Sequence, residues 1–426
     1  MKNSFWLTIR HFSHGVRVYL FISAIIGVAY FGVISVLLNL YLLRLGYDTQ
    51  FIGLANGTIS IAFATTSIPA GAIGSRIGHT RAVVLGVWCF ILSMVGLPLC
   101  EYLPPLWQET GIIITRLLNG AGFALYIVNA HPYLVNTTTS KDRDLAFALL
   151  VAIPPVAGFA GNLLAGLLPG MIAAWLGMPL DSPVPYRYPI YLAAILLVPA
   201  LFALWTVEEV EPERMKVESP PEVRASSLPT SSAPYFLIAA LAVTALFRMA
   251  GEGATRSFFN VYLDTDLSVS TARIGALYAI GQIIAGPTAL FSPMLIRRWG
   301  KVPVAVAGTI GIAASMVLMA LVPHWAAVGA GFAGVIGMLS ITRAVTTVYQ
   351  MEIVAPEWRG LMSGTVSMAM GIGFTSMALG GGFIIPILGY QGLFLVGAAM
   401  VTFSALLFWV LFRVPRGEFA QRPALG

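Results

Sequence analysis

Residues 71–81 read GAIGSRIGHTR, a short polar and basic stretch at the junction of two long apolar runs. The run before it covers residues 51–73, and the run after it covers residues 82–103. Each run can cross a membrane as a helix, because a hydrocarbon core about 30 Å thick needs roughly 20 apolar residues. The stretch is therefore predicted to be a tight loop at the membrane surface.

The same pattern continues in both directions along the chain. The apolar runs cover residues 18–43, 51–73, 82–103, 111–135, 145–168, 189–207, 235–263, 274–296, 302–322, 326–350, 361–385 and 391–412. They are too long for buried strands, and a transmembrane barrel would show shorter segments of alternating polarity. The predicted fold class is an all-α membrane protein with twelve transmembrane helices.

Composition excludes the other broad classes of protein. Of the 426 residues, 58% are hydrophobic and 10% are charged, whereas a soluble domain has roughly 25% charged residues. A disordered chain would be poor in apolar residues, and two cysteines cannot build a disulfide scaffold. The sequence has no metal-ligand cluster, phosphate-binding loop or nucleophile elbow. An enzyme, a metal site and a cofactor are therefore not expected.

The distribution of basic residues sets the expected orientation. Most of the 24 lysines and arginines fall in loops on the side of the two termini, and such residues concentrate in short cytoplasmic loops. We expect a multi-pass protein of the cell (inner) membrane with both termini in the cytoplasm. The net charge of +6 follows from this topology, so no nucleic acid partner is expected. The first apolar run is too long for a cleaved signal.

The two halves of the chain resemble each other. Arg76-Ile77-Gly78 recurs as Arg298-Trp299-Gly300, and further matches precede it in the same order. Such a series indicates parallel repeats, related by an axis along the membrane normal. The predicted organisation is a cytoplasmic N-terminal segment (1–17), which could form an interfacial helix, an N-terminal six-helix bundle (18–207), a cytoplasmic linker (208–234), a C-terminal six-helix bundle (235–412) and a cytoplasmic tail (413–426).

On these features the sequence resembles the major facilitator superfamily of secondary transporters. The family loop between spans two and three reads Gly-x-x-x-Asp-Arg-x-Gly-Arg-Arg/Lys. Residues 71–81 match it at Gly71, Arg76, Gly78 and Arg81, and Ser75 stands at the acidic position. Residues 116–124, RLLNGAGFA, are similar to the family motif Arg-x-x-Gln-Gly-x-Gly-x-Ala. The resemblance implies that the loop and its second-half copy form a gating loop on the cytoplasmic side. Its matching positions are Gly71, Arg76, Gly78, Arg81, Arg298 and Gly300.

Five ionisable side chains fall at bilayer depth, where a charge is costly and usually faces the bundle interior or a water-filled cavity. They are Arg116, Arg248, Glu252, Arg256 and Arg343. Residues 248, 252 and 256 are spaced by four, so they share one face of a helix. In one interpretation, both arginines of this helix neutralise Glu252 in a structural network. In the other, Glu252 carries an exchangeable proton or helps to hold a cation, and Arg248 tunes the pKa of Glu252.

The surplus of arginine suggests the class of solute. A guanidinium can bind a carboxylate or phosphate through two parallel hydrogen bonds, although Arg116 could equally be structural. We predict a secondary transporter that moves a small organic solute, anionic or zwitterionic, by alternating access with proton coupling. The expected partners are this solute, protons and membrane lipids, and the protein is expected to be a monomer. Further candidates for the cavity wall, each of which could equally be a helix contact, are Tyr30, Asn129, Asn162, Tyr278 and Gln282.

Two other functions remain open at this point. One is a multidrug/proton efflux antiporter with a mostly aromatic pocket. The other is a membrane receptor or assembly factor that has the transporter scaffold but moves no solute, and whose partners attach to the linker.

Overall fold

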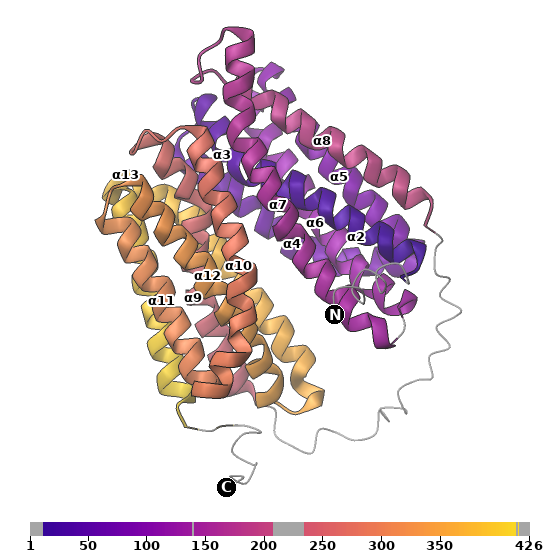
Figure 1. The fold of residues 1–426 in the computed structure, drawn as a ribbon, viewed down its shortest axis with the longest axis vertical. Coiled ribbons are helices and arrows are strands. Elements are labelled where there is room, and N and C mark those ends of the chain that lie inside the picture. The colour runs from indigo at the N-terminus through magenta and orange to yellow at the C-terminus, as the bar shows by residue number, and fades with distance from the viewer. Residues whose placement is uncertain (1–11, 139, 208–233, 415, 417–426) are drawn as a thin grey trace. The chain divides into compact units, whose positions relative to one another are not determined.

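The computed structural model describes residues 12–138, 140–207, 234–414 and 416, and every element in these ranges is helical (Figure 1). In chain order the elements are α2 (His14–Ile26), η1 (Gly27–Ile34), α3 (Ser35–Arg44), α4 (Thr49–Ile77), α5 (His79–Leu99), η2 (Cys100–Tyr102), α6 (Pro105–Thr137), α7 (Ser140–Leu176), α8 (Val184–Trp205), α9 (Tyr235–Thr265), α10 (Thr271–Trp299), α11 (Lys301–Leu321), α12 (Trp325–Ile353), η4 (Pro356–Trp358) and α13 (Arg359–Phe412). Eleven stretches of the described chain are long and apolar enough to cross a membrane.

The last of these stretches holds two crossings. Helix α13 has 54 residues, which is about 80 Å at 1.5 Å per residue and more than twice the thickness of a hydrocarbon core. Gly389 interrupts it with φ 68° and ψ 178°, values that lie outside the helical region. The predicted runs 361–385 and 391–412 lie on either side of this glycine. The predicted fold class, with twelve membrane-spanning helices, is therefore confirmed.

The first crossing begins before the predicted residue 18. Ser13 caps helix α2, because its hydroxyl accepts a hydrogen bond from the Val16 amide at 3.4 Å and satisfies an otherwise unpaired amide. The middle of the crossing, η1, is a π-helix of eight residues. A Cβ added at Gly32 in this segment would lie 2.4 Å from the Gly161 Cα. Only glycine lets the π-helix and α7 approach so closely.

The internal repeat is visible in the backbone. Gly78 joins α4 to α5 with φ 101°, and Gly300 joins α10 to α11 with φ 82°. The Gly78 amide donates to the Gly74 carbonyl at 3.0 Å, and the Gly300 amide donates to the Ile296 carbonyl at 2.8 Å. Helices α4 and α10 both have 29 residues, and α5 and α11 both have 21. The two loops that share a sequence pattern therefore also share a local geometry.

The positive φ at Gly300 leads to a test of the loop. Replacing Gly300 by alanine should destabilise the protein by about 1–3 kcal/mol, because a side chain rarely tolerates this backbone region. The control is Gly364→Ala in α13, where the added Cβ meets no atom within 4 Å and alanine favours the helix. Thermal unfolding in detergent should show a lower midpoint for Gly300→Ala alone. Equal midpoints for Gly300→Ala and the wild type would show that the loop is not constrained.

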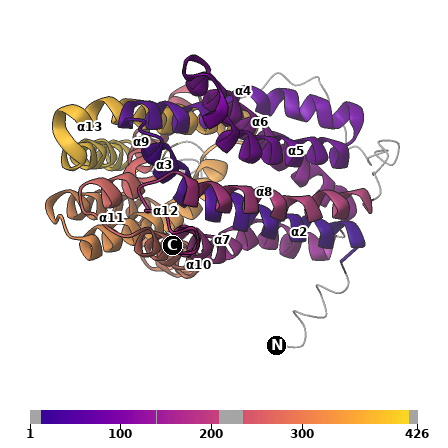
Figure 2. The same cartoon turned by 90° about the horizontal axis from the view of Figure 1, so that it is seen from above.

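The described chain packs as two compact units. Among the described residues, the first unit holds 12–47, 58–138, 140–207 and 270–279. Within it, α5 packs along α6 and α8 (Figure 2), and α7 packs against η1. The start of α10 belongs to this unit because Gly275 contacts α7. A Cβ added at Gly275 would lie 2.6 Å from the Gly166 Cα.

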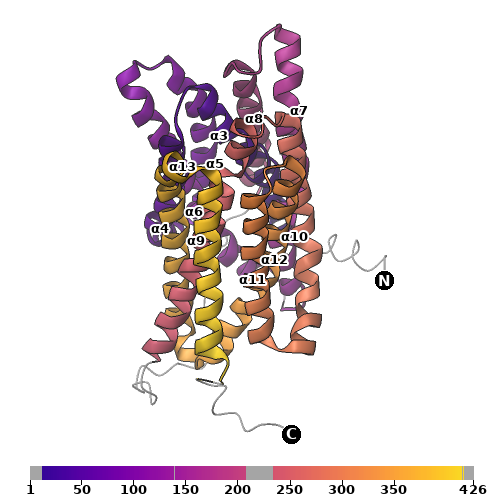
Figure 3. The same cartoon turned by 90° about the vertical axis from the view of Figure 1, so that its left-hand side faces the viewer.

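Among the described residues, the second unit holds 48–57, 234–269, 280–414 and 416. Within it, α13 packs along α9 and α11, and α11 packs along α12 (Figure 3). Buried side chains such as Leu241, Val345 and Met362 form its apolar core. The predicted bundle boundaries stay a prediction. Most of the N-terminal segment, the linker and the tail lies outside the described residues.

Candidate functional site

Helix α9 places a carboxylate inside the second unit. Glu252 is 3% exposed and lies near the middle of the helix. Its Oε1 accepts a hydrogen bond from Arg256 Nε at 2.6 Å, one turn further along α9. Arg343 of α12 donates from Nη2 to Oε2 at 2.9 Å and to Oε1 at 3.2 Å. These three residues form the Glu252 triad, in which one carboxylate is held by two guanidinium groups.

The members of the triad differ in exposure. The side chain of Glu252 is 4% exposed, that of Arg256 is 37% exposed and that of Arg343 is 47% exposed. The carboxylate is therefore buried, whereas more than a third of each arginine side chain that binds it is exposed.

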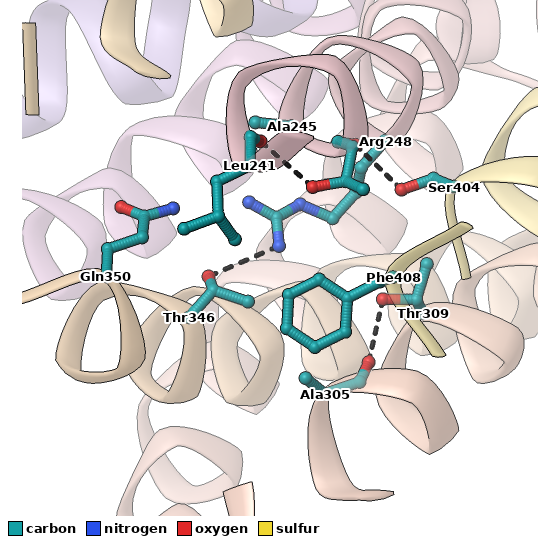
Figure 4. A pocket seen from close by; sticks show the side chains of 10 residues that line it. Leu241, Ala245, Arg248, Ala305, Thr309, Thr346, Gln350, Ser404 and Phe408 are labelled. Atoms are coloured by element: carbon teal, nitrogen blue, oxygen red, sulfur yellow. Dashed lines mark hydrogen bonds between the residues drawn. The ribbon is translucent and has the colours of Figure 1, made fainter. Parts of the chain in front are cut away.

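Arg248 lies on the same face of α9 but makes different contacts. It is 6% exposed, and its Nη1 donates to the Thr346 hydroxyl at 3.2 Å (Figure 4). Its Nε has no hydrogen-bond partner, and no ion pair of Arg248 occurs among the described residues. The second partner of Glu252 is thus Arg343 of another helix, a pairing that sequence spacing did not predict. The two were each recognised only as charges at bilayer depth.

Arg116 is the buried cation of the first unit. It is 1% exposed on α6, and its Nε and Nη2 have no hydrogen-bond partner within the described residues. Tyr30 is close enough to interact with it electrostatically. A buried donor that lacks a partner costs about 1–3 kcal/mol. Arg116 is therefore a costly side chain that has donors to offer a ligand.

An aromatic cluster surrounds Tyr30 in the same unit. The Tyr30 ring lies 5.5 Å from Phe123, 5.6 Å from Phe90 and 5.2 Å from Phe31, measured between centroids. Phe63 of α4 lies 5.4 Å from Phe123. Tyr30 and Phe31 belong to the π-helix η1, and such π-helical turns are frequent at functional sites. The cluster was not predicted, because its members come from four separate segments.

The three further candidates Asn162, Tyr278 and Gln282 lie on α7 and α10. Asn162 on α7 is fully buried, and its Oδ1 accepts a hydrogen bond from the Ser35 hydroxyl at 3.2 Å. Its Nδ2 finds no acceptor in the described part of the chain. Tyr278 and Gln282 follow one another by a turn on α10, Tyr278 buried and Gln282 partly exposed.

Asn129 of α6 makes hydrogen bonds to α4, to α5 and within its own helix. Its Nδ2 donates to the Ala70 carbonyl at 3.1 Å and to the Leu125 carbonyl at 3.0 Å. Its Oδ1 lies 3.0 Å from His79 Nδ1. A Cβ added at Gly74 would lie 1.6 Å from this same oxygen. Asn129 therefore connects α6 to the loop at residues 71–81, and both the nitrogen and the oxygen of its amide have hydrogen-bond partners.

The gating-loop candidates lie at helix ends. Gly71 and Arg76 are in α4, Arg81 is in α5, and both arginine side chains are exposed. In the second copy, the Arg298 guanidinium lies 5.7 Å from the centroid of the Trp299 ring.

Ser75 stands where the family loop carries an acid, and the contacts of the two loop copies differ. The Ser75 hydroxyl donates to the Ala72 carbonyl of its own helix at 3.0 Å, so this bond does not connect two helices. In the second copy, Lys301 forms an ion pair with Glu352, which joins the start of α11 to the end of α12. This ion pair was not predicted, because Glu352 lies far from the loop in sequence.

Comparisons with known proteins identify the family. The sequence model of the Major Facilitator Superfamily matches residues 19–250 and 241–424. No curated protein matches the sequence. The proteins of this family are transporters and not enzymes.

Solved structures match the fold over nearly the whole chain. The xylose transporter of E. coli in an inward-open conformation is 15% identical, with 92% of this chain and 96% of that chain covered and a TM-score of 0.70. A bacterial homologue of the human lysosomal transporter Spinster is 16% identical, with 96% and 98% covered and a TM-score of 0.71. A structure of proton-dependent oligopeptide transporters is 13% identical, with 94% and 98% covered and a TM-score of 0.71. At these identities the likeness shows the fold alone. From the matched family and this fold, the chain belongs to the major facilitator superfamily and is a multi-pass membrane transporter of a small molecule.

Proposed function

We propose that this chain is a proton-coupled secondary transporter of a small organic solute that is anionic or zwitterionic. The observation that supports this most strongly is the Glu252 triad, a buried carboxylate bonded to two arginines that are partly exposed. Carboxylates at bilayer depth are commonly proton sites in transporters. In this proposal Glu252 is the coupling group, and Arg343 is the group that binds the solute.

The chemistry of the triad links the two events. A proton on Glu252 would remove the negative charge that holds Arg343. Arg343 could then donate both of its terminal nitrogens to a carboxylate of the solute, a geometry that a guanidinium matches well. When Glu252 loses its proton, its carboxylate competes with the solute for the same donors. Proton binding and solute binding would thus favour each other.

The charge balance supports an anionic group on the solute. At bilayer depth the sequence has four arginines and one glutamate, namely Arg116, Arg248, Arg256, Arg343 and Glu252. Arg116 of the first unit has two donors without partners among the described residues. A carboxylate that accepted from them would offset the cost of burying this charge. A zwitterionic solute would also satisfy Arg116 through its carboxylate, while its ammonium group donated to a hydrogen-bond acceptor.

The remaining parts of the proposal concern the setting. We infer that the protein acts as a monomer in the cell (inner) membrane with both termini in the cytoplasm, since basic residues concentrate in the loops on that side. Alternating access by rocking of two repeat-related bundles is the mechanism that a parallel repeat implies. Asn162, Tyr278 and Gln282 are proposed as secondary polar contacts for the solute.

A second function is favoured by one specific observation. The rings of Tyr30, Phe31, Phe63, Phe90 and Phe123 form an aromatic cluster in the first unit. Aromatic faces attract lipophilic cations, so the cluster suits a multidrug/proton efflux antiporter. The adjacent Arg116 opposes this, because a buried cation repels a cationic drug.

A thermal-shift screen of the purified protein tests the class of solute. Small carboxylates, amino acids, lipophilic cations and sugars are added one at a time. We expect a carboxylate or an amino acid to raise the unfolding temperature of the wild type and to have little effect on Arg343→Gln. Arg343→Lys, which keeps the charge but not the fork of donors, should recover part of the shift.

Two results, one from this screen and one from a flux assay in proteoliposomes, would contradict the proposal. Stabilisation by lipophilic cations alone would favour the efflux antiporter. Binding of a carboxylate without any flux in proteoliposomes would favour a receptor on the transporter scaffold.

A further inference from the structure

A small polar cavity lies inside the second unit, apart from the Glu252 triad. Helices α9, α11, α12 and the second half of α13 line it (Figure 4). The centre of a water-sized sphere can move within about 10 Å³, which is close to the room that one water molecule needs. The cavity therefore has space for a single small occupant.

Arg248 brings a positive charge to this cavity. Its side chain extends between Leu241 and Phe408, and its guanidinium points toward Thr346 (Figure 4). The hydroxyl of Thr346 is a neutral acceptor, and Nε has no partner among the described residues. A buried charge that is balanced only by a neutral dipole is unfavourable.

The nearby carboxylate does not balance this charge. Glu252 lies one turn along α9, but its two oxygens already accept three hydrogen bonds from Arg256 and Arg343. With Arg248 included, three guanidinium groups accompany a single carboxylate in this part of the unit. The local surplus is positive, so the potential in the cavity attracts an anion.

The other lining side chains can donate hydrogen bonds. Thr309, Thr346 and Ser404 contribute hydroxyls, and Gln350 contributes an amide. The hydroxyls of Thr346 and Ser404 donate to the carbonyls of Thr342 and Thr244, at 2.8 Å and 2.7 Å. The Thr309 hydroxyl donates to the Ala305 carbonyl at 2.7 Å within its own helix. A hydroxyl can rotate, so this proton can turn from the carbonyl to a bound anion. The helix keeps its backbone hydrogen bond at that carbonyl.

We propose that this cavity binds one small inorganic anion, of the size of chloride, which serves as the counter-ion of Arg248. Water fits the same volume but would leave the charge of the guanidinium unbalanced. The anion is a resident part of the second unit and is distinct from the transported solute. The proposal therefore does not depend on the identity of that solute or on proton coupling.

Thermal unfolding of the full-length protein in detergent tests the site with sodium chloride, sodium bromide and sodium gluconate at equal ionic strength. We expect chloride and bromide to raise the unfolding temperature of the wild type in a saturable manner. Gluconate, which is too large for the cavity, should not. Arg248→Gln should show no difference between the three salts.

Two threonine variants test the site independently if Arg248→Gln fails to fold. Thr309→Val removes a donor from the lining and should raise the half-saturating chloride concentration about tenfold, the loss expected for one hydrogen bond to a charged group. Thr402→Val is the matched control. Its hydroxyl also donates to a carbonyl one turn back, at 2.8 Å, but it does not line the cavity, so chloride should act as in the wild type.

Other results would overturn the proposal. A rise in unfolding temperature that is the same in all three salts would mean that the cavity holds only water. The same conclusion would follow if Thr309→Val and Thr402→Val responded equally to chloride. Crystals grown in bromide should show an anomalous peak beside Arg248, and a cavity without such a peak would also contradict the site.

Discussion

Replacing Glu252 by glutamine is expected to abolish accumulation of the solute against its gradient while exchange of solute across the membrane continues. Glutamine is nearly the same shape as glutamate but cannot gain or lose a proton. A pH gradient of one unit is worth about 1.4 kcal/mol per proton, which would sustain about tenfold accumulation. The variant should reach only equal concentrations on the two sides.

The assay uses proteoliposomes and the carboxylate or amino acid found in the thermal-shift screen. Uptake is measured with an imposed pH gradient, and counterflow is measured without one. The matched control is Glu352→Gln, which removes a carboxylate that is paired with Lys301 at the ends of α11 and α12. This control should keep its response to the gradient. Loss of both uptake and counterflow in Glu252→Gln would indicate that Glu252 has only a structural role.

Replacing Arg116 by methionine is expected to stabilise the protein and to abolish transport. Two nitrogens of Arg116 lack partners among the described residues, and each such donor costs about 1–3 kcal/mol. Methionine has a similar length and no polar hydrogen, so the cost disappears. The unfolding temperature should rise by several degrees. Transport should fall about a hundredfold or more, because a buried contact to the charge of the solute is lost.

The control for this effect is Arg187→Met. Arg187 forms an ion pair with Glu101 and donates to the Tyr102 hydroxyl at 2.7 Å. Its removal leaves the Glu101 carboxylate with the Tyr41 hydroxyl as a hydrogen-bond donor but without its positive partner, so the unfolding temperature should fall. A fall of similar size in Arg116→Met would show that Arg116 holds the first unit together instead of binding the solute.

The sequence predicts the helices better than the contacts between them. Twelve apolar runs translate directly into crossings, because the thickness of the bilayer fixes the length of a helix. The two tight loops were also predictable, since Gly78 and Gly300 share a sequence pattern and both have positive φ. The break at Gly389 coincides with the short gap between the last two runs.

The candidate site was predictable only in part. The five ionisable side chains at bilayer depth could be found by their position in apolar runs. Of the partners of Glu252, the spacing of four predicted Arg256. It also favoured Arg248 and could not predict Arg343, which meets Glu252 across 91 residues of chain. Likewise, the sequence made Asn129 a candidate for either the cavity wall or a helix contact, and it could not predict the hydrogen bonds of its amide with Ala70 and His79.

The most direct test of the central claim is a measurement of proton movement itself. A pH-sensitive dye is enclosed in proteoliposomes, and the solute is added outside. The wild type is predicted to move protons in proportion to the solute, and Glu252→Gln is predicted to exchange solute without any change in dye signal. Equal proton movement in the wild type and in Glu252→Gln would contradict the assignment of Glu252 as the coupling carboxylate.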